Sequence, residues 1–406
     1  MTYDVEGLRA HFPSLATGIA HFDGPGGTQT PLAVGQAIAA TLTGALSNRG
    51  TSSLPERNAD DAVTGFRLAM ADLLGADPRG IVYGRSATQL TYDFSRMLAR
   101  EWGLGDEVVV TRLDHDSNIR PWVQAAERAG ATVRWVDFDP ATGELPADAV
   151  AAVLTERTRL VAVTAASNLI GTRPPVADIA EAVHAVGALL YVDGVHYAAH
   201  AAVDFGALGA DFFVCSPYKF LGPHCGVLAA APALLEGLHP DKLLPSTDQV
   251  PERFEFGTLQ YELMAGTTAA VDFLAGLGGG AHGEAPGTGR RDRLAASSIA
   301  LEEYEAELRA RLEDGLAALP GVTVHSRAAE RTPTLLITFA GRAAADASRF
   351  LIGRDILAPA GSFYALEASR RLGLGDEGGL RIGLAPYTTS EEVRHLLSAL
   401  RDFTLQ

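Results

Sequence analysis

Residues 188–194 read ALLYVDG, and residues 211–222 read DFFVCSPYKFLG. Each stretch opens with an apolar run typical of a strand buried on both faces, and each run leads to an ionisable residue, Asp193 or Lys219. Five further runs have this character: GIVYG (80–84), EVVVT (107–111), TVRWVDF (132–138), RLVAVTA (159–165) and GVLAA (226–230). Helical patterns separate most of them, at 88–101, 119–130, 146–153 and 176–187. This alternation predicts an α/β domain around a mostly parallel sheet, in which ligands bind at the carboxyl ends of the strands.

The remainder of the chain predicts a second, smaller domain. A long apolar helix (258–276) is expected at the end of the large domain, and the small domain's expected elements are a long amphipathic helix (292–319), strands at 322–325, 334–339 and 379–383, and helices at 343–353 and 390–402. Between the two long helices lies GLGGGAHGEAPGTGR (276–290), whose glycines favour a flexible connection. We expect an N-terminal segment (1–20) packed on the small domain, a large domain (21–275), a connection (276–291) and a small C-terminal α/β domain (292–406).

Composition narrows the class of protein. The 406 residues include 49 acidic and 33 basic side chains, giving a formal charge of −16 that disfavours nucleic acid and anionic membranes as partners. We find no apolar run long enough for a transmembrane helix and no secretory signal, so we expect a cytoplasmic protein. Cys215 and Cys225 are the only cysteines, which excludes a disulfide scaffold and a multi-cysteine metal site. The histidines lack ligand spacing, so a zinc hydrolase has no support.

Lysine is so rare that its position is informative. Lys219 and Lys242 are the only lysines among the 33 basic residues, and the other 31 are arginines. Lysine, unlike arginine, can lose its proton and act as an amine nucleophile. Lys219 lies among Tyr218, Phe220 and Leu221, and desolvation there would lower its pKa. A lysine whose head reaches water is the ordinary alternative, and Asp193 at the preceding strand end favours a chemical role instead.

Three other strand ends carry polar residues. GIVYG leads through Arg85 and Ser86 to Ala87 and Thr88 at a helix start, which suits an anion such as phosphate, although a plain helix cap is the simpler explanation. His115 and Asn168 follow the strands at 107–111 and 159–165. A loop histidine or a turn asparagine is commonplace by itself. No G-x-G-x-x-G follows the first strand, so a Rossmann dehydrogenase is not supported.

The order of these motifs resembles the class V aminotransferases, a family of fold-type I pyridoxal 5'-phosphate enzymes that includes cysteine desulfurases, selenocysteine lyases and isopenicillin N epimerase. The similarity runs from HFDGPGG (21–27) to GLRIG (379–383). It implies that Lys219 forms the Schiff base with the cofactor and moves the Cα proton, while Asp193 keeps the pyridine nitrogen protonated. It also implies that His115 stacks on the ring. The implied contacts to the ring hydroxyl are Asn168 and His196, and those to the phosphate are Ala87, Thr88 and Ser216.

The resemblance also assigns substrate and subunit contacts. Arg381 matches the arginine that binds the substrate carboxylate, and Gly27, with Gly26, would let the backbone approach that carboxylate. Gly257 and Thr258 match a segment that reaches the phosphate of a neighbouring subunit, which implies a homodimer with shared active sites. We thus expect a small amino-acid-type substrate and no metal.

The sequence departs from the desulfurases at a decisive position. PAGSFYALE (359–367) corresponds to their mobile cysteine loop, and Tyr364 stands where the cysteine would be. A phenol cannot carry a persulfide, so we expect that this chain is not a persulfide-forming desulfurase. Tyr218 replaces the usual histidine before the lysine, and His196 replaces a common glutamine. Transamination, elimination or C–S lysis, racemisation and cyclisation remain open, and the alternative is a non-catalytic cofactor-binding homologue or partner subunit.

Overall fold

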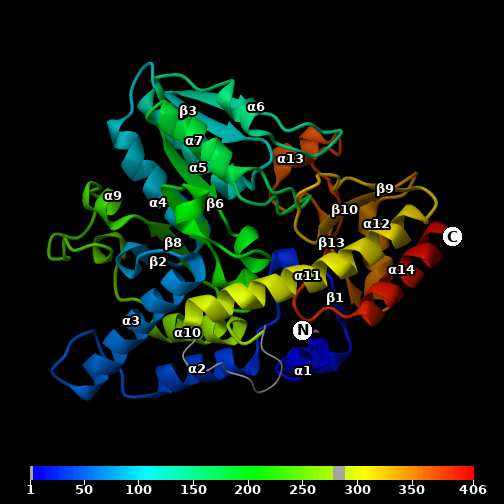
Figure 1. Cartoon of the computed structure of the whole chain (residues 1–406), viewed down its shortest axis with the longest axis horizontal. Coiled ribbons are helices and arrows are strands. Elements are labelled where there is room, and N and C mark those ends of the chain that lie inside the picture. Colours follow the sequence, from blue (N-terminus) through cyan, green and yellow to red (C-terminus); the bar gives the residue numbers. More distant parts are fainter. Residues whose placement is uncertain (1–2, 278–288) are drawn as a thin grey trace.

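Short runs of Val, Ile, Leu and Phe form the central sheet of the computed structural model (Figure 1), which describes residues 3–277 and 289–406. Across the sheet the strand order is β2-β8-β7-β6-β5-β3-β4. All neighbours pair in parallel except β8, which is antiparallel to both β2 and β7. The strands are β2 (Ile81–Gly84), β3 (Glu107–Thr111), β4 (Thr132–Val136), β5 (Thr158–Thr164), β6 (Leu189–Asp193), β7 (Phe212–Cys215) and β8 (Gly226–Ala230). The predicted mostly parallel α/β architecture is confirmed.

Alternation along each strand divides the large domain's core into two layers. In β6, Leu190 and Val192 join the cluster on one face of the sheet, whereas Tyr191 joins the cluster on the other. Helices cover both faces because the strands are apolar on both sides. They are α2 (Leu32–Thr43), α3 (Leu54–Leu74), α4 (Ala87–Leu98), α5 (Arg120–Ala129), α6 (Ala147–Ala151), α7 (Val176–Ala185), α8 (Phe205–Leu208), α9 (Pro232–Glu236) and α10 (Tyr261–Leu274).

The smaller domain has its own antiparallel sheet and core. The sheet has the order β12-β13-β10-β9, and Leu335, Ile337 and Leu380 are buried beneath its helices. Its elements are β9 (Val322–Val324), β10 (Thr334–Phe339), α12 (Ala344–Ile352), β11 (Ile356–Leu357), β12 (Ala360–Gly361), α13 (Leu366–Arg371), β13 (Gly379–Gly383) and α14 (Ser390–Thr404). Strand β11 pairs instead with β1 (Ala20–His21) of the N-terminal segment.

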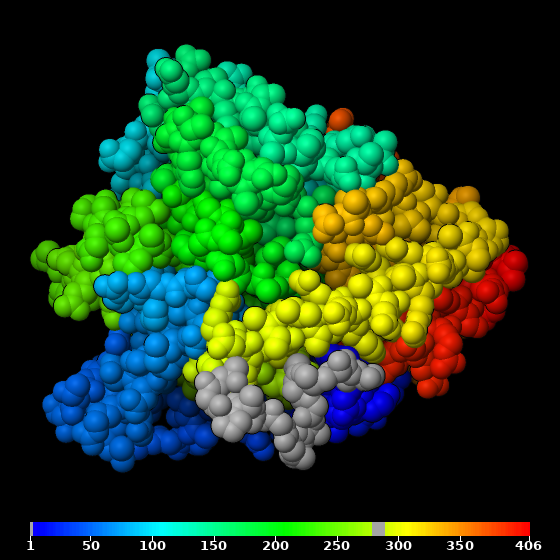
Figure 2. Space-filling model, viewed as in Figure 1, coloured from blue at the N-terminus to red at the C-terminus, as the bar shows by residue number. Residues whose placement is uncertain are grey.

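Helix α11 (Arg290–Ala317) joins the two domains. Leu294 near its start belongs to the large domain's core, and Leu308 and Leu312 belong to the core of the small domain. In the space-filling view the yellow α11 runs from the green part of the chain to the orange and red part (Figure 2). Residues 278–288 of the predicted connection lie outside the described residues. Within the part of the chain that is described, no helix is both long and apolar enough to cross a membrane.

The N-terminal segment contacts both domains. After α1 (Val5–Arg9), the Phe12 ring lies 5.7 Å from Phe273 of α10 and 5.3 Å from Tyr387. Arg9 forms an ion pair of 3.0 Å with Glu392 of α14. The segment therefore packs on the small domain and also reaches the large domain, because Phe12 contacts both Phe273 and Tyr387.

Candidate active site

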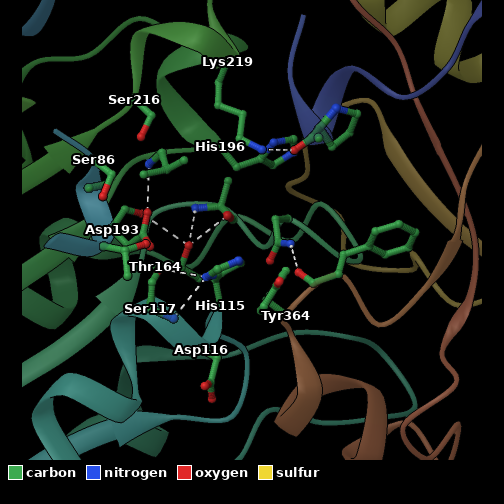
Figure 3. A pocket seen from close by; sticks show the side chains of 18 of the residues that line it. Ser86, His115, Asp116, Ser117, Thr164, Asp193, His196, Ser216, Lys219 and Tyr364 are labelled. Atoms are coloured by element: carbon green, nitrogen blue, oxygen red, sulfur yellow. Dashed lines mark hydrogen bonds between the residues drawn. The ribbon is translucent and has the colours of Figure 1, made fainter. Parts of the chain in front are cut away.

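The carboxyl ends of five strands meet at one cavity of about 660 Å³ (Figure 3). Ser86 follows β2, His115 follows β3, Ala166 and Asn168 follow β5, Asp193 ends β6, and Ser216 and Lys219 follow β7. In open α/β sheets, ligands bind at the carboxyl ends of the strands, and the cavity lies at this edge of the sheet. The labelled side chains from these strand ends converge on the same space in Figure 3. Arg381 of β13 and Phe363 contribute the small domain's side of the cavity.

Lys219 lies in a short 3₁₀ turn, η7 (Pro217–Lys219), directly after β7. Its Nζ donates a hydrogen bond to the carbonyl oxygen of Pro25 and lies 5.0 Å from the centre of the Tyr218 ring. Burial and the nearby Arg381 charge together lower the pKa of Lys219 to about 7, although Asp193 opposes the shift. A large fraction of the amine is thus unprotonated near neutral pH, as a nucleophilic lysine requires.

The loop that carries Pro25 is bound to the lysine turn. Thr28 donates its backbone N–H to the Tyr218 carbonyl oxygen at 3.0 Å, and its hydroxyl accepts the N–H of Leu221 at 2.9 Å. On its other side Pro25 packs on β13, where a Cβ at Gly383 would lie 2.1 Å from the proline ring. The loop is bonded to the lysine turn on one side and packs on β13 on the other. It therefore holds Lys219 where the two domains meet.

Asp193 presents a buried carboxylate to the cavity. Its side chain is 5% exposed, and one oxygen accepts the N–H of Val195 at 2.9 Å. Burial raises the pKa of Asp193 to about 6, although this hydrogen bond and Lys219 lower it. A Cβ at Gly194 would lie 1.9 Å from the Phe213 ring, so only glycine fits directly after the carboxylate. A buried carboxylate in this position favours a cationic partner such as a protonated ring nitrogen.

The start of α4 forms another wall of the cavity. Ser86 caps this helix by accepting the N–H of Gln89 at 3.0 Å, and Ala87, Thr88 and Ser216 line the cavity beside it. A Cβ at Gly226 would lie 2.3 Å from the Ser86 carbonyl carbon, so the helix start rests directly on β8. Free N–H groups and the helix dipole make such a terminus suitable for a phosphate.

His115 presents a neutral ring. Its Nδ1 accepts the backbone N–H of Ser117 at 3.1 Å, which places the ring proton on Nε2. Burial lowers the pKa of His115 to about 4, with Lys219 and Arg381 adding to the effect. An uncharged imidazole with a fixed plane is suited to stacking on an aromatic ring.

Three buried polar atoms around the cavity have no hydrogen-bond partner: Asn168 Oδ1, His196 Nδ1 and Arg381 Nε. Their side chains are held by other atoms. Asn168 Nδ2 donates to the Phe363 carbonyl oxygen at 2.9 Å, His196 Nε2 lies 3.0 Å from the hydroxyls of Thr332 and Thr334, and Arg381 Nη1 donates to the Asn168 carbonyl oxygen at 3.0 Å. Unpaired buried polar atoms cost free energy unless a ligand pairs them. Together with the amine, the carboxylate and the helix start, they fit a phosphorylated aromatic aldehyde.

The structure separates some of the residues that the sequence grouped. Gly27 does not line the cavity; it lies beside Tyr218, and Gly26 lines the cavity instead. Gly257 and Thr258 are exposed and away from this chain's cavity. Tyr364, predicted to contact the substrate, does line the cavity at its mouth, where it is 76% exposed and its ring lies 5.6 Å from that of His115. The remaining predicted site residues line the cavity: Ala87, Thr88, His115, Asn168, Asp193, His196, Ser216, Lys219 and Arg381.

Sequence reasoning missed other lining residues. Thr164, the last residue of β5, donates its hydroxyl to the Ala166 carbonyl oxygen at 2.8 Å. Its place at a carboxyl strand end was a usable signal. Tyr92, Asp116 and Arg120 also line the cavity. They come from helices and a loop whose approach depends on tertiary packing, so nothing in the local sequence indicates them.

Comparisons with known proteins agree with this geometry. Residues 20–396 match the family model described as Aminotransferase class-V. An aminotransferase-like protein, FGM3, of Gibberella zeae is 32% identical, covering 98% of each chain. A cysteine desulfurase of Enterobacter sp. (strain 638) is 29% identical, covering 99% of this chain and 98% of the relative. The crystal structure of the Escherichia coli cysteine desulfurase CsdA has a TM-score of 0.85 at 26% identity, covering 100% of this chain and 99% of that one. The chain therefore belongs to the class V aminotransferase family, whose enzymes depend on pyridoxal 5'-phosphate.

Proposed function

We propose that this enzyme activates Cα of an amino acid, or of an amino-acid-derived substrate, without passing sulfur through a cysteine persulfide. The observation that carries the proposal is the placement of three groups around one cavity: the Lys219 amine, the Asp193 carboxylate and the Arg381 guanidinium. Burial lowers the pKa of Lys219 to about 7, so this amine is available both to bond to an aldehyde and to accept a proton.

Each residue has a part that follows from its surroundings. When bound, pyridoxal 5'-phosphate supplies an aldehyde and an electron-withdrawing ring that stabilises negative charge at Cα. Asp193 would hold the ring nitrogen, and Ala87, Thr88 and Ser216 would hold the phosphate. Arg381 would orient the substrate carboxylate, and Lys219 Nζ would take the Cα proton.

Lys219→Ala should abolish covalent attachment of the cofactor, because no other amine lines the cavity among the residues described. Borohydride reduction followed by intact-mass measurement should show the cofactor fixed to the wild-type chain and not to the variant. Lys242→Ala is the matched control, since Lys242 pairs with Asp248 at 3.0 Å outside the cavity and should keep full labelling. Labelling of Lys219→Ala at the wild-type level would refute the assignment.

Arg381→Gln should raise the amino-acid concentration needed for half-maximal exchange of the Cα proton in deuterated water by about 10- to 100-fold. A charged hydrogen bond contributes about 1.5–3 kcal/mol, and 1.4 kcal/mol corresponds to tenfold. The wild type is first tested on a panel of single L-amino acids by NMR. Arg349→Gln, which breaks an exposed ion pair with Asp346, is the control. The absence of exchange from any substrate would favour the non-catalytic alternative.

The two cysteines support the exclusion of a persulfide. Cys215 and Cys225 are 0% and 1% exposed, and neither lines the cavity. Burial raises the pKa of the Cys225 thiol to about 12, and that of the Cys215 thiol is also raised by burial. Both thiols are thus poor nucleophiles, because the thiolate is the reactive form.

A chain carrying both Cys215→Ala and Cys225→Ala should therefore keep the wild-type rate of Cα exchange. The measurement is the same NMR assay, supported by peptide mass spectrometry of the wild type after incubation with L-cysteine. A sulfur adduct on either cysteine, together with loss of activity in the cysteine-free chain, would contradict the proposal. Products then separate the remaining reactions: elimination releases ammonia and a keto acid, whereas transamination needs an added keto acid for turnover.

We also propose a homodimer with shared sites. Phe256 is 42% exposed, and the neighbouring Gly257 and Thr258 are exposed too, which suits contact with a second copy. Light scattering should give twice the 42.6 kDa of one chain.

Mixed dimers test whether the sites are shared. A chain with Thr258→Asp would disable its partner's site, because the aspartate would repel the phosphate there. A chain with Lys219→Ala would disable its own site, because it lacks the amine. Exchange activity should thus reappear when the two inactive chains are mixed, because half of the sites in a mixed dimer are intact. A monomeric mass, or no recovery on mixing, would overturn the shared-site model.

A further inference from the structure

The segment that begins at Ser362 closes one side of the cavity with an unusual backbone. Phe363 and Tyr364 have φ of 53° and 58°, in the left-handed region that side chains rarely adopt. This conformation is unfavourable for residues other than glycine, so the surrounding structure must hold both in place.

Glu367, the second residue of α13, connects this segment to the large domain. One carboxylate oxygen accepts from Arg112 Nη1 at 3.0 Å, and the other accepts from Arg120 Nη2. The Glu367 side chain is 11% exposed while Arg112 and Arg120 are 32% and 29% exposed, so the ion pairs are partly shielded from water and salt. Arg112 and Arg120 stand on either side of the His115 loop, and the glutamate therefore bridges the two flanks of that loop.

Main-chain bonds place the two left-handed residues against the large domain. Asp116 donates its N–H to the Tyr364 carbonyl oxygen at 2.7 Å, and the Asn168 side chain donates to the Phe363 carbonyl oxygen. The Phe363 ring then lies 3.7 Å from Cζ of Arg381. The position of the predicted carboxylate-binding arginine thus depends on the position of this segment.

We propose that Glu367 is a positioning residue that latches residues 362–367 across the cavity mouth, so that Phe363 holds Arg381 in its substrate-binding orientation. This rests on the proposed function, since Arg381 is the group that would bind the substrate carboxylate. The segment then acts as a fixed wall of the substrate site.

The arginines keep other partners when Glu367 is neutralised. Arg112 Nε pairs with Asp137 at 2.7 Å and its guanidinium lies 4.5 Å from the centre of the Trp135 ring, while Arg120 Nε pairs with Asp116 at 2.8 Å. Glu367→Gln retains the side-chain shape and leaves neither arginine alone. The variant is therefore expected to fold, and its effect should stay local.

The test compares the Glu367→Gln and wild-type holoenzymes. Hydrogen exchange should quicken at least tenfold in the amides of residues 363–367, a factor that corresponds to about 1.4 kcal/mol, and not in the central sheet. Phenylglyoxal should modify Arg381 faster, as mapped by peptide mass spectrometry. The half-saturating amino-acid concentration should rise while the limiting rate of Cα exchange stays unchanged.

Asp376→Asn is the matched control, because it breaks an exposed ion pair with Arg370 at the other end of α13. It should leave all three readouts at wild-type values. Wild-type exchange in residues 363–367 of Glu367→Gln, or exchange that rises equally throughout the small domain, would overturn the latch. If the proposed function is wrong, the wild type would show no Cα exchange. The two readouts that need no substrate, hydrogen exchange of the amides and phenylglyoxal modification of Arg381, would still respond to Glu367→Gln.

Discussion

The site depends on keeping the Lys219 amine out of water and close to another positive charge. Desolvation and Arg381 both act against its protonation, and Asp193 compensates only in part. A protonated amine would be costly there, so the fold favours the neutral, nucleophilic form. Such an arrangement needs a rigid scaffold, because a flexible lysine would extend its head into solvent. The adjacent strand ends of β6 and β7, and the loop that carries Pro25, supply that rigidity.

The cavity exists only where the two domains meet. The central sheet supplies the amine and the carboxylate, and the small domain supplies Arg381. A second contact lies behind the cavity, where His200 of the large domain and Glu305 of α11 form a buried pair at 2.9 Å. The His200 ring lies 4.9 Å from the His196 ring, so the orientation of a cavity histidine is linked to the helix that joins the domains. The geometry of the site is therefore linked to how the two domains pack on each other.

Some features of the fold and of the site could be predicted from the sequence, and others could not. Asp193 and Lys219 were predictable because strand periodicity alone places them at one edge of a parallel sheet. The helices at 32–43 and 54–74 were not predicted, although Ser53 and Glu56 form a capping box at the start of the second. Gly26 and Gly27 were predicted together and only Gly26 lines the cavity, because which residue of a loop faces a cavity depends on contacts from elsewhere. Arg120 depends in the same way on packing between distant segments.

The segment at the mouth of the cavity, residues 362–367, is bonded to the large domain at several points. A carrier segment must leave its position, so strong contacts to the rest of the protein would oppose its work. Here the corresponding backbone is left-handed at two successive residues, bonded to Asp116 and Asn168, and followed by a shielded carboxylate between two arginines. If this segment left its position, partly buried charges would lose their partners. The free-energy cost of that loss favours the position seen in the structure. Under the proposed function, a wall of this kind would hold Arg381 in place before the substrate carboxylate binds, which lowers the entropy that binding must otherwise lose.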